Sequence, residues 1–155
     1  MVYKKIFMIP NLDRPYPFHF AAECGFLEIC EMIMENMDEK NPKDHWGYTP
    51  LHRAAENGRL EVCKLIVENL QCDKEMCKRY QCDKNPKNDH NFTPLHMAAM
   101  NGHLQVCKLI IESICENPNP RLDRGDPKIA KSRSCNRRAK KRIELYLRKK
   151  FPTWS

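Results

Sequence analysis

The chain has 155 residues, of which 41% are hydrophobic and 30% are charged, a composition ordinary for a soluble globular domain. It contains no apolar run near the roughly 20 residues that span a bilayer. The apolar stretch Ile6–Pro10 is also shorter than the core of a secretory signal, about 7–15 residues. These features argue against a membrane-spanning protein, and we expect an intracellular one, in the cytoplasm or the nucleus.

Charge divides the chain into two regions. Residues 121–155 carry 13 Lys or Arg and 3 Asp or Glu, whereas residues 1–120 carry 14 and 17. The net charge of +7 therefore combines a basic tail of +10 with a body of −3. An asymmetry of this kind is typical of a protein with two functional regions.

After a lead-in over residues 1–11, one sequence block occurs three times. It begins as Tyr16–His19, returns after 33 residues as Thr49–His52, and returns after a further 44 as Thr93–His96. The last two copies match nearly residue for residue as far as Ile66 and Ile110. A period of this length is typical of stacked supersecondary units.

Each copy predicts a helix–turn–helix. Thr49 is a favourable N-cap, and Pro50 sits at the first helical position, where its missing N–H costs nothing. Gly58 supplies the left-handed residue that ends the first helix. The second helix, Leu60–Leu70, is apolar on too many sides to be stable alone. Stacking against neighbouring copies is what would bury that surface.

Nine cysteines, an odd number, cannot all pair within the chain. Cys30, Cys63 and Cys107 recur at one repeat position among apolar neighbours, which favours buried thiols acting as small hydrophobes. A disulfide-rich secreted domain would not place cysteines on helical core positions. We therefore expect these thiols to be reduced and unbonded.

These blocks resemble the ankyrin repeat, which has a period of about 33 residues and the signature T-P-L-H-x-A. The resemblance covers roughly residues 12–120 and implies an all-α fold, an α-solenoid of three stacked ankyrin helix–turn–helix repeats with finger loops. The predicted repeats run at about 14–46, 47–90 and 91–120, and the second contains an inserted loop near 71–84. The sequence departs from the family pattern at Tyr16, Phe18 and Asn91. Asn91 occupies the place of the finger glycine Gly47, and asparagine tolerates the left-handed conformation.

The basic tail, residues 121–155, predicts a degenerate capping repeat or helix. Ala139, Ile143, Tyr146 and Leu147 fall on one helical face. The strongest basic run consists of Arg137, Arg138, Lys140, Lys141 and Arg142. This run is either the solvated face of the capping helix or a contact for nuclear import, nucleic acid or an anionic membrane.

No motif in the sequence indicates catalysis, since nucleophile, phosphate-loop and zinc-protease patterns are all missing. His19, His52 and His96 recur at one repeat position, and the resemblance implies that they hydrogen-bond within and between adjacent loops. The cysteines of the inserted loop, Cys72, Cys77 and Cys82, lack the C-x-x-C spacing of structural zinc sites. We therefore expect a non-enzymatic monomer without catalytic residues, metal or cofactor.

The resemblance implies a protein–protein interaction module whose partner contacts the finger tips and the exposed positions of each first helix. The matching positions here are His45, Trp46, Tyr48, Arg53, Glu56, Asn57, Asp89, His90, Phe92, Met97, Met100 and Asn101. Large apolar side chains are favoured interface anchors. We predict one continuous exposed strip on the concave side, formed by Trp46, Tyr48, Phe92, Met97 and Met100. The alternative is that each of these side chains packs on a neighbouring finger.

Overall fold

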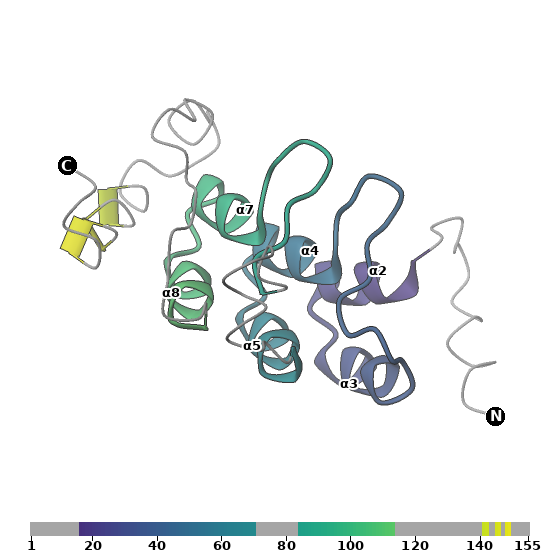
Figure 1. The fold of residues 1–155 in the computed structure, drawn as a ribbon. Coiled ribbons are helices and arrows are strands. Elements are labelled where there is room, and N and C mark those ends of the chain that lie inside the picture. The colour runs from purple at the N-terminus through teal and green to yellow at the C-terminus, as the bar shows by residue number, and fades with distance from the viewer. Residues whose placement is uncertain (1–15, 71–83, 114–140, 143–144, 147, 150–155) are drawn as a thin grey trace, which may run out of the picture.

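The computed structural model shows a row of stacked helix pairs (Figure 1). It describes residues 16–70 and 84–113, and, within the tail, residues 141–142, 145–146 and 148–149. The helices of the stack are α2 (Pro17–Cys24), α3 (Leu27–Glu35), α4 (Pro50–Glu56), α5 (Leu60–Asn69), α7 (Pro94–Met100) and α8 (Leu104–Ser113). Every regular element in these described ranges is a helix, which confirms the predicted all-α stack.

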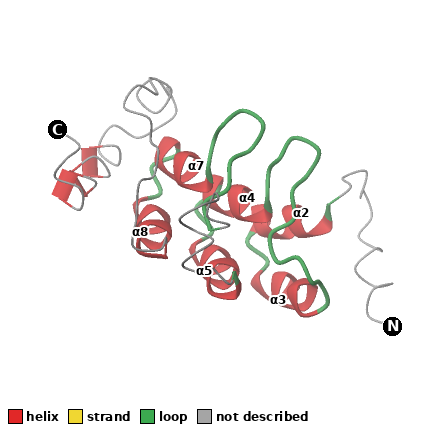
Figure 2. Cartoon of the chain, in the orientation of Figure 1, coloured by secondary structure: helices red, strands yellow, loops and turns green. Residues whose placement is uncertain are grey.

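The helices form two rows, with α2, α4 and α7 in an inner row and α3, α5 and α8 in an outer row (Figure 2). Helix α4 packs against both α2 and α7, and α5 packs against both α3 and α8. The loops that join one pair to the next project beyond the inner row as two fingers. The fingers therefore extend from the inner row of helices.

The core consists of the facing surfaces of the two rows. Leu51, Leu95 and Ile66 are among its fully buried side chains, and burial of such side chains is the main source of stability in a stack of this kind. Cys30, Cys63 and Cys107 are buried and free of disulfides, as predicted. Burial raises the pKa of the Cys30 and Cys63 thiols to about 12, so both remain protonated and unreactive.

The inner helices α4 and α7 begin at the predicted threonine caps. The Thr49 hydroxyl accepts from the backbone N–H of His52 at 3.4 Å, and the Thr49 N–H donates to Nδ1 of His52 at 3.1 Å. This reciprocal pair is a capping box with histidine in the place usually taken by glutamate. The N-cap residue of helix α2 is Tyr16, which makes no side-chain cap hydrogen bond.

Histidine side chains also connect each repeat to the following finger. The His19 Nε2–H donates to the carbonyl of Tyr48 at 2.9 Å, and the His52 Nε2–H donates to the carbonyl of Phe92 at 3.0 Å. Because Nδ1 of His52 accepts from an N–H while Nε2 faces a carbonyl, only the neutral ring with its proton on Nε2 satisfies both contacts. This is the scaffold role that the family resemblance implied. Burial lowers the pKa of His19, and it lowers that of His52 to about 4.

The turns between paired helices contain the expected left-handed residues. Gly58 and Gly102 have φ values of 66° and 78°, and Asn91 adopts 62° at the finger position where Gly47 has 74°.

A second contact between repeats crosses the turns within the helix pairs. Arg59 Nε donates to the carbonyl of Glu23 at 3.0 Å, and His103 Nε2 donates to the carbonyl of Glu56 at 3.0 Å. The sequence analysis did not find this contact.

The tail contacts the last helix pair through Tyr146. Its hydroxyl donates to Glu112 of α8 at 3.2 Å, and Lys108 Nζ lies 5.3 Å from its ring centroid. The described tail residues are helical, and the capping repeat or helix over residues 121–155 stays a prediction. Ala139, Ile143 and Leu147 lie outside the described residues, as do Arg137, Arg138, Lys140 and residues 71–83 of the inserted loop.

Replacing Gly58 with alanine should destabilise the stack for two separable reasons. The positive φ costs an alanine about 1–2 kcal/mol. In addition, a Cβ at this position would lie 2.5 Å from Nδ1 of His103. We expect the thermal midpoint of Gly58→Ala, measured by circular dichroism, to fall by about 2–8 °C per kcal/mol lost. The same change should lower the thermal midpoint less in a His103→Ala background, because only the cost of the positive φ remains. Lys64→Ala, a change at an exposed position of α5, is the control. A thermal midpoint of Gly58→Ala equal to that of the wild type would contradict this account.

Acid should destabilise the stack through His52. The folded protein disfavours protonation of this ring, since its pKa falls from 6.5 to about 4. The unfolded chain binds the proton below about pH 6.5, so this contribution to stability is complete above that pH and is lost as the pH falls. Between about pH 7.5 and about pH 5, the loss should be about 2 kcal/mol. Urea unfolding across this range measures it. His52→Gln should show a shallower dependence on pH than exposed His45→Gln, and equal slopes would contradict the assignment.

Candidate partner-binding surface

Each finger turn is folded by a single side-chain oxygen. Oδ1 of Asp44 accepts from the backbone N–H groups of Trp46 and Tyr48 at 2.9 and 2.8 Å. Asn88 repeats the arrangement in the next finger, where it accepts from His90 and Phe92. Short Asp and Asn side chains favour such turns because they replace a backbone acceptor. Two backbone N–H groups of each turn are thereby satisfied within the finger itself.

The fingers are fixed to the inner helices and to each other. Oδ1 of Asn41 accepts from the N–H of Leu51 at 3.2 Å, and Asn85 makes the equivalent contact with Leu95. The backbone N–H of Asp89 donates to the carbonyl of Trp46 at 3.1 Å. The two fingers therefore lie side by side and form one surface (Figure 1).

Half of the predicted contact residues are exposed to solvent. These are His45, Trp46, Asn57, Asp89, His90 and Asn101. Trp46 is the most notable of them, because 52% of its surface is accessible at the tip of the first finger. The His45 ring lies between Trp46 and Tyr16, with centroid separations of 3.5 and 6.2 Å. Tyr16 was not predicted to belong to this surface.

The other aromatic finger residues pack partly on the scaffold. The Tyr48 ring meets the His52 ring edge-on at 5.6 Å, and the Arg53 guanidinium lies over it at 4.4 Å. Phe92 meets the His96 ring in the same manner at 6.1 Å. Both aromatic residues are half-buried, so each combines a packing role with a smaller accessible surface.

Arg53 and Glu56 are half-buried as well, and they belong to a small charged network. Arg53 lies 3.7 Å from the Asp44 carboxylate and 3.5 Å from that of Glu56. The charge of Arg53 is therefore largely balanced within the first finger and α4. The sequence analysis missed Asp44, although its place two residues before Trp46, matched by Asn88 before His90, was a visible signal of the shared turn.

The prediction of a continuous exposed strip is wrong at Met97, which is only 7% exposed. It occupies the repeat position of Arg53, which is itself only partly open to solvent. At such a position an unbranched apolar side chain lowers the free energy of the folded protein by packing against it and being removed from water. Met100 is half-buried. The accessible apolar surface is therefore concentrated at Trp46 and does not extend as a strip.

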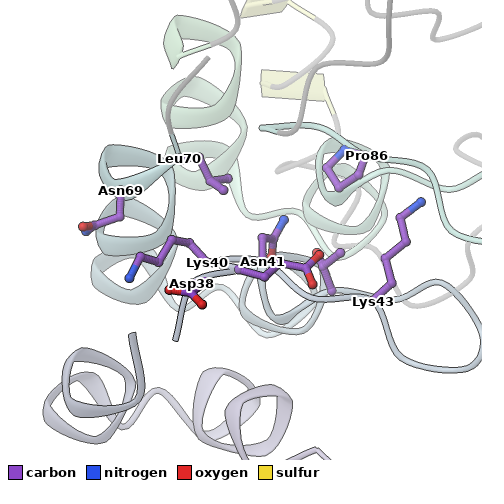
Figure 3. A pocket seen from close by; sticks show the side chains of 9 residues that line it. Asp38, Lys40, Asn41, Lys43, Asn69, Leu70 and Pro86 are labelled. Atoms are coloured by element: carbon purple, nitrogen blue, oxygen red, sulfur yellow. The ribbon is translucent and has the colours of Figure 1, made fainter. Parts of the chain in front are cut away.

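The structure also contains a hollow of about 480 Å³ at the base of the fingers (Figure 3). Its lining includes Lys40, Lys43 and Asn41. Lys40 Nζ donates to the carbonyls of Met34 and Met37, which closes the end of α3, and Lys43 Nζ donates to the carbonyl of Lys87. Both lysine side chains thus serve structural contacts.

The described residues include no group of three or more His, Cys, Asp or Glu side chains able to hold a metal ion. Cys72, Cys77 and Cys82 lie outside the described ranges, so the prediction for the inserted loop stays a prediction. None of the described helices combines the length and apolarity required to cross a membrane.

Comparison with known families agrees with the repeat geometry. A model described as ankyrin repeats in three copies matches residues 4–76. A single ankyrin-repeat model matches residues 90–121. No curated protein gives a significant match to the chain. The two family matches together span well over half of the sequence, and they cover all the described helices of the stack. The chain belongs to the ankyrin-repeat family.

Proposed function

We propose that this protein binds a partner protein through the tips of its fingers, with Trp46 as the main anchor. Ankyrin repeats are generally non-enzymatic modules for protein–protein interaction. The observation that carries the finer proposal is the 52% exposure of Trp46 on a turn whose Trp46 and Tyr48 N–H groups already donate to Asp44. An exposed tryptophan of this kind stabilises a complex more than it stabilises the free protein.

The surroundings of Trp46 suit an interface. The His45 ring contacts the Trp46 ring at a tilt and limits its freedom, so less side-chain entropy is lost on binding. Asp89 and His90 on the second finger are exposed and supply hydrogen-bonding groups at the edge of the apolar anchor. An apolar centre with a polar rim is the usual arrangement of a specific interface. Asn57 and Asn101 extend the polar surface along the inner helices.

A second candidate function uses the basic tail. Lys141 and Arg142 are exposed, as are Arg148 and Lys149, and such a cluster suits the phosphates of nucleic acid or an anionic membrane. This alternative would make the protein a nuclear or nucleic-acid-associated factor, whereas the finger proposal requires only an intracellular location. The two differ in their response to salt, because contacts with phosphates weaken steeply as salt rises.

Replacing Trp46 with alanine should reduce partner binding and leave stability nearly unchanged. Partners would be recovered from native cell extract on wild-type protein, and their affinity then compared between variants. We expect Trp46→Ala to lose about 1–3 kcal/mol of binding free energy. His90→Ala is the matched control, since His90 holds the equivalent position in the next finger, and it should lose less. Met97→Ala should show the opposite profile, with a lower thermal midpoint and retained binding.

Two results would count against the finger proposal. One is full recovery of every partner by Trp46→Ala. The other is binding that disappears in about 0.5 M salt and also on removal of residues 121–155, which would favour the basic tail.

A further inference from the structure

Helix α3 differs in charge from the other two outer helices. Its exposed residues include Glu28, Glu31 and Glu35, and it contains no basic residue. At the repeat position of Glu31, helices α5 and α8 carry Lys64 and Lys108. None of the three glutamates forms an ion pair with another residue of the described ranges. The first outer helix is thus an acidic surface at one end of the stack.

This acidic surface lies beside an exposed apolar side chain. At about 100° per residue, Glu28, Glu31, Met32 and Glu35 fall within an arc of about 100° on the helix. Met32 lies at one edge of this arc, next to Glu28, and is 41% exposed, and Phe26 beside the start of the helix is 48% exposed. We call Glu28, Met32 and Glu35 the acidic triplet, with spacing i, i+4, i+7.

The tail presents the opposite pattern with the same spacing. Lys141, Leu145 and Arg148 stand at i, i+4 and i+7 in helical conformation, and all three are exposed. Leu145, at the centre of this basic triplet, is 56% exposed. The neighbouring Tyr146 points to another side, where it contacts Glu112 and Lys108 of α8. The basic triplet is therefore anchored at the far end of the stack and faces solvent.

The two triplets cannot meet within one molecule. Helix α3 packs on α2 and α5, and α5 lies between α3 and α8 in the outer row (Figure 1). Because Tyr146 rests on α8, the basic triplet lies beyond the opposite end of that row. Complementary surfaces at opposite ends of a molecule can join only different copies.

We propose that the protein associates head to tail, with the basic triplet of one copy on the acidic triplet of the next. The shared spacing lets Leu145 pack on Met32 while Lys141 and Arg148 lie beside the glutamates. A contact of one helix on one helix is smaller than the roughly 1,200 Å² of a stable interface, so association is weak and sensitive to salt. It is an alternative to our sequence-based expectation of a monomer.

A charge-swap experiment on the full chain tests this association. One variant carries Glu28→Lys with Glu35→Lys, and the other carries Lys141→Glu with Arg148→Glu. Sedimentation velocity at low salt, up to about 1 mM protein, should show wild type self-associating and each variant monomeric. Mixing the two variants should restore association, because the intact tail of the first meets the intact α3 of the second. About 0.5 M salt should abolish it.

The matched control is Glu61→Lys with Glu68→Lys, which reverses the equivalent positions of α5 and should leave self-association unchanged. Thermal melts establish that each variant is folded, and nuclease treatment removes any bridging nucleic acid. Wild type that stays monomeric throughout overturns the proposal. So does a folded variant that associates alone as wild type does, or a mixture that does not recover association.

Discussion

The structure depends on one neutral imidazole ring that contacts two repeats at once. His52 caps its own helix through Nδ1 and holds the next finger through Nε2. A flat ring fixes the angle between these two contacts, so the start of one helix and the position of the following finger are set together. His19 holds the carbonyl of Tyr48 in the same way, and Tyr48 is two residues from Trp46. The orientation of the exposed surface around Trp46 thus depends on the hydrogen bond from His19 to the Tyr48 carbonyl.

The first repeat lacks half of this arrangement. Tyr16 stands where the other repeats have threonine, and Nδ1 of His19 is buried with no hydrogen-bond partner among the residues that the structure describes. The Tyr16 ring packs on the His19 ring at 5.0 Å in place of a cap. An unsatisfied buried nitrogen is costly, so the terminal pair is held less firmly than the pairs that follow. The same tyrosine also reaches His45, which links this weak end to the finger surface.

The sequence was sufficient to predict the scaffold because its determinants are local. A threonine followed three residues later by histidine specifies a cap, and Gly58 specifies a left-handed turn whatever surrounds it. The exposed surface was harder to predict, because exposure depends on residues distant in sequence. Tyr48 is half-buried because Arg53 lies over its ring, and repeat position alone gave no sign that Met97 is buried. The crossing of His103 over Gly58 was likewise invisible, since it joins residues 45 positions apart only after stacking.

The inserted loop shows how independent of chain length the stack is. The connection before the second finger is 11 residues longer than the one before the first. Asn85 and Asn88 nevertheless make the same contacts as Asn41 and Asp44, and they lie the same number of residues before the following helix. The packing of the helix pairs therefore does not depend on the length of the chain between Leu70 and residue 84. That junction is a natural splice point, where a foreign peptide or a reporter domain can be introduced without redesigning the repeats on either side.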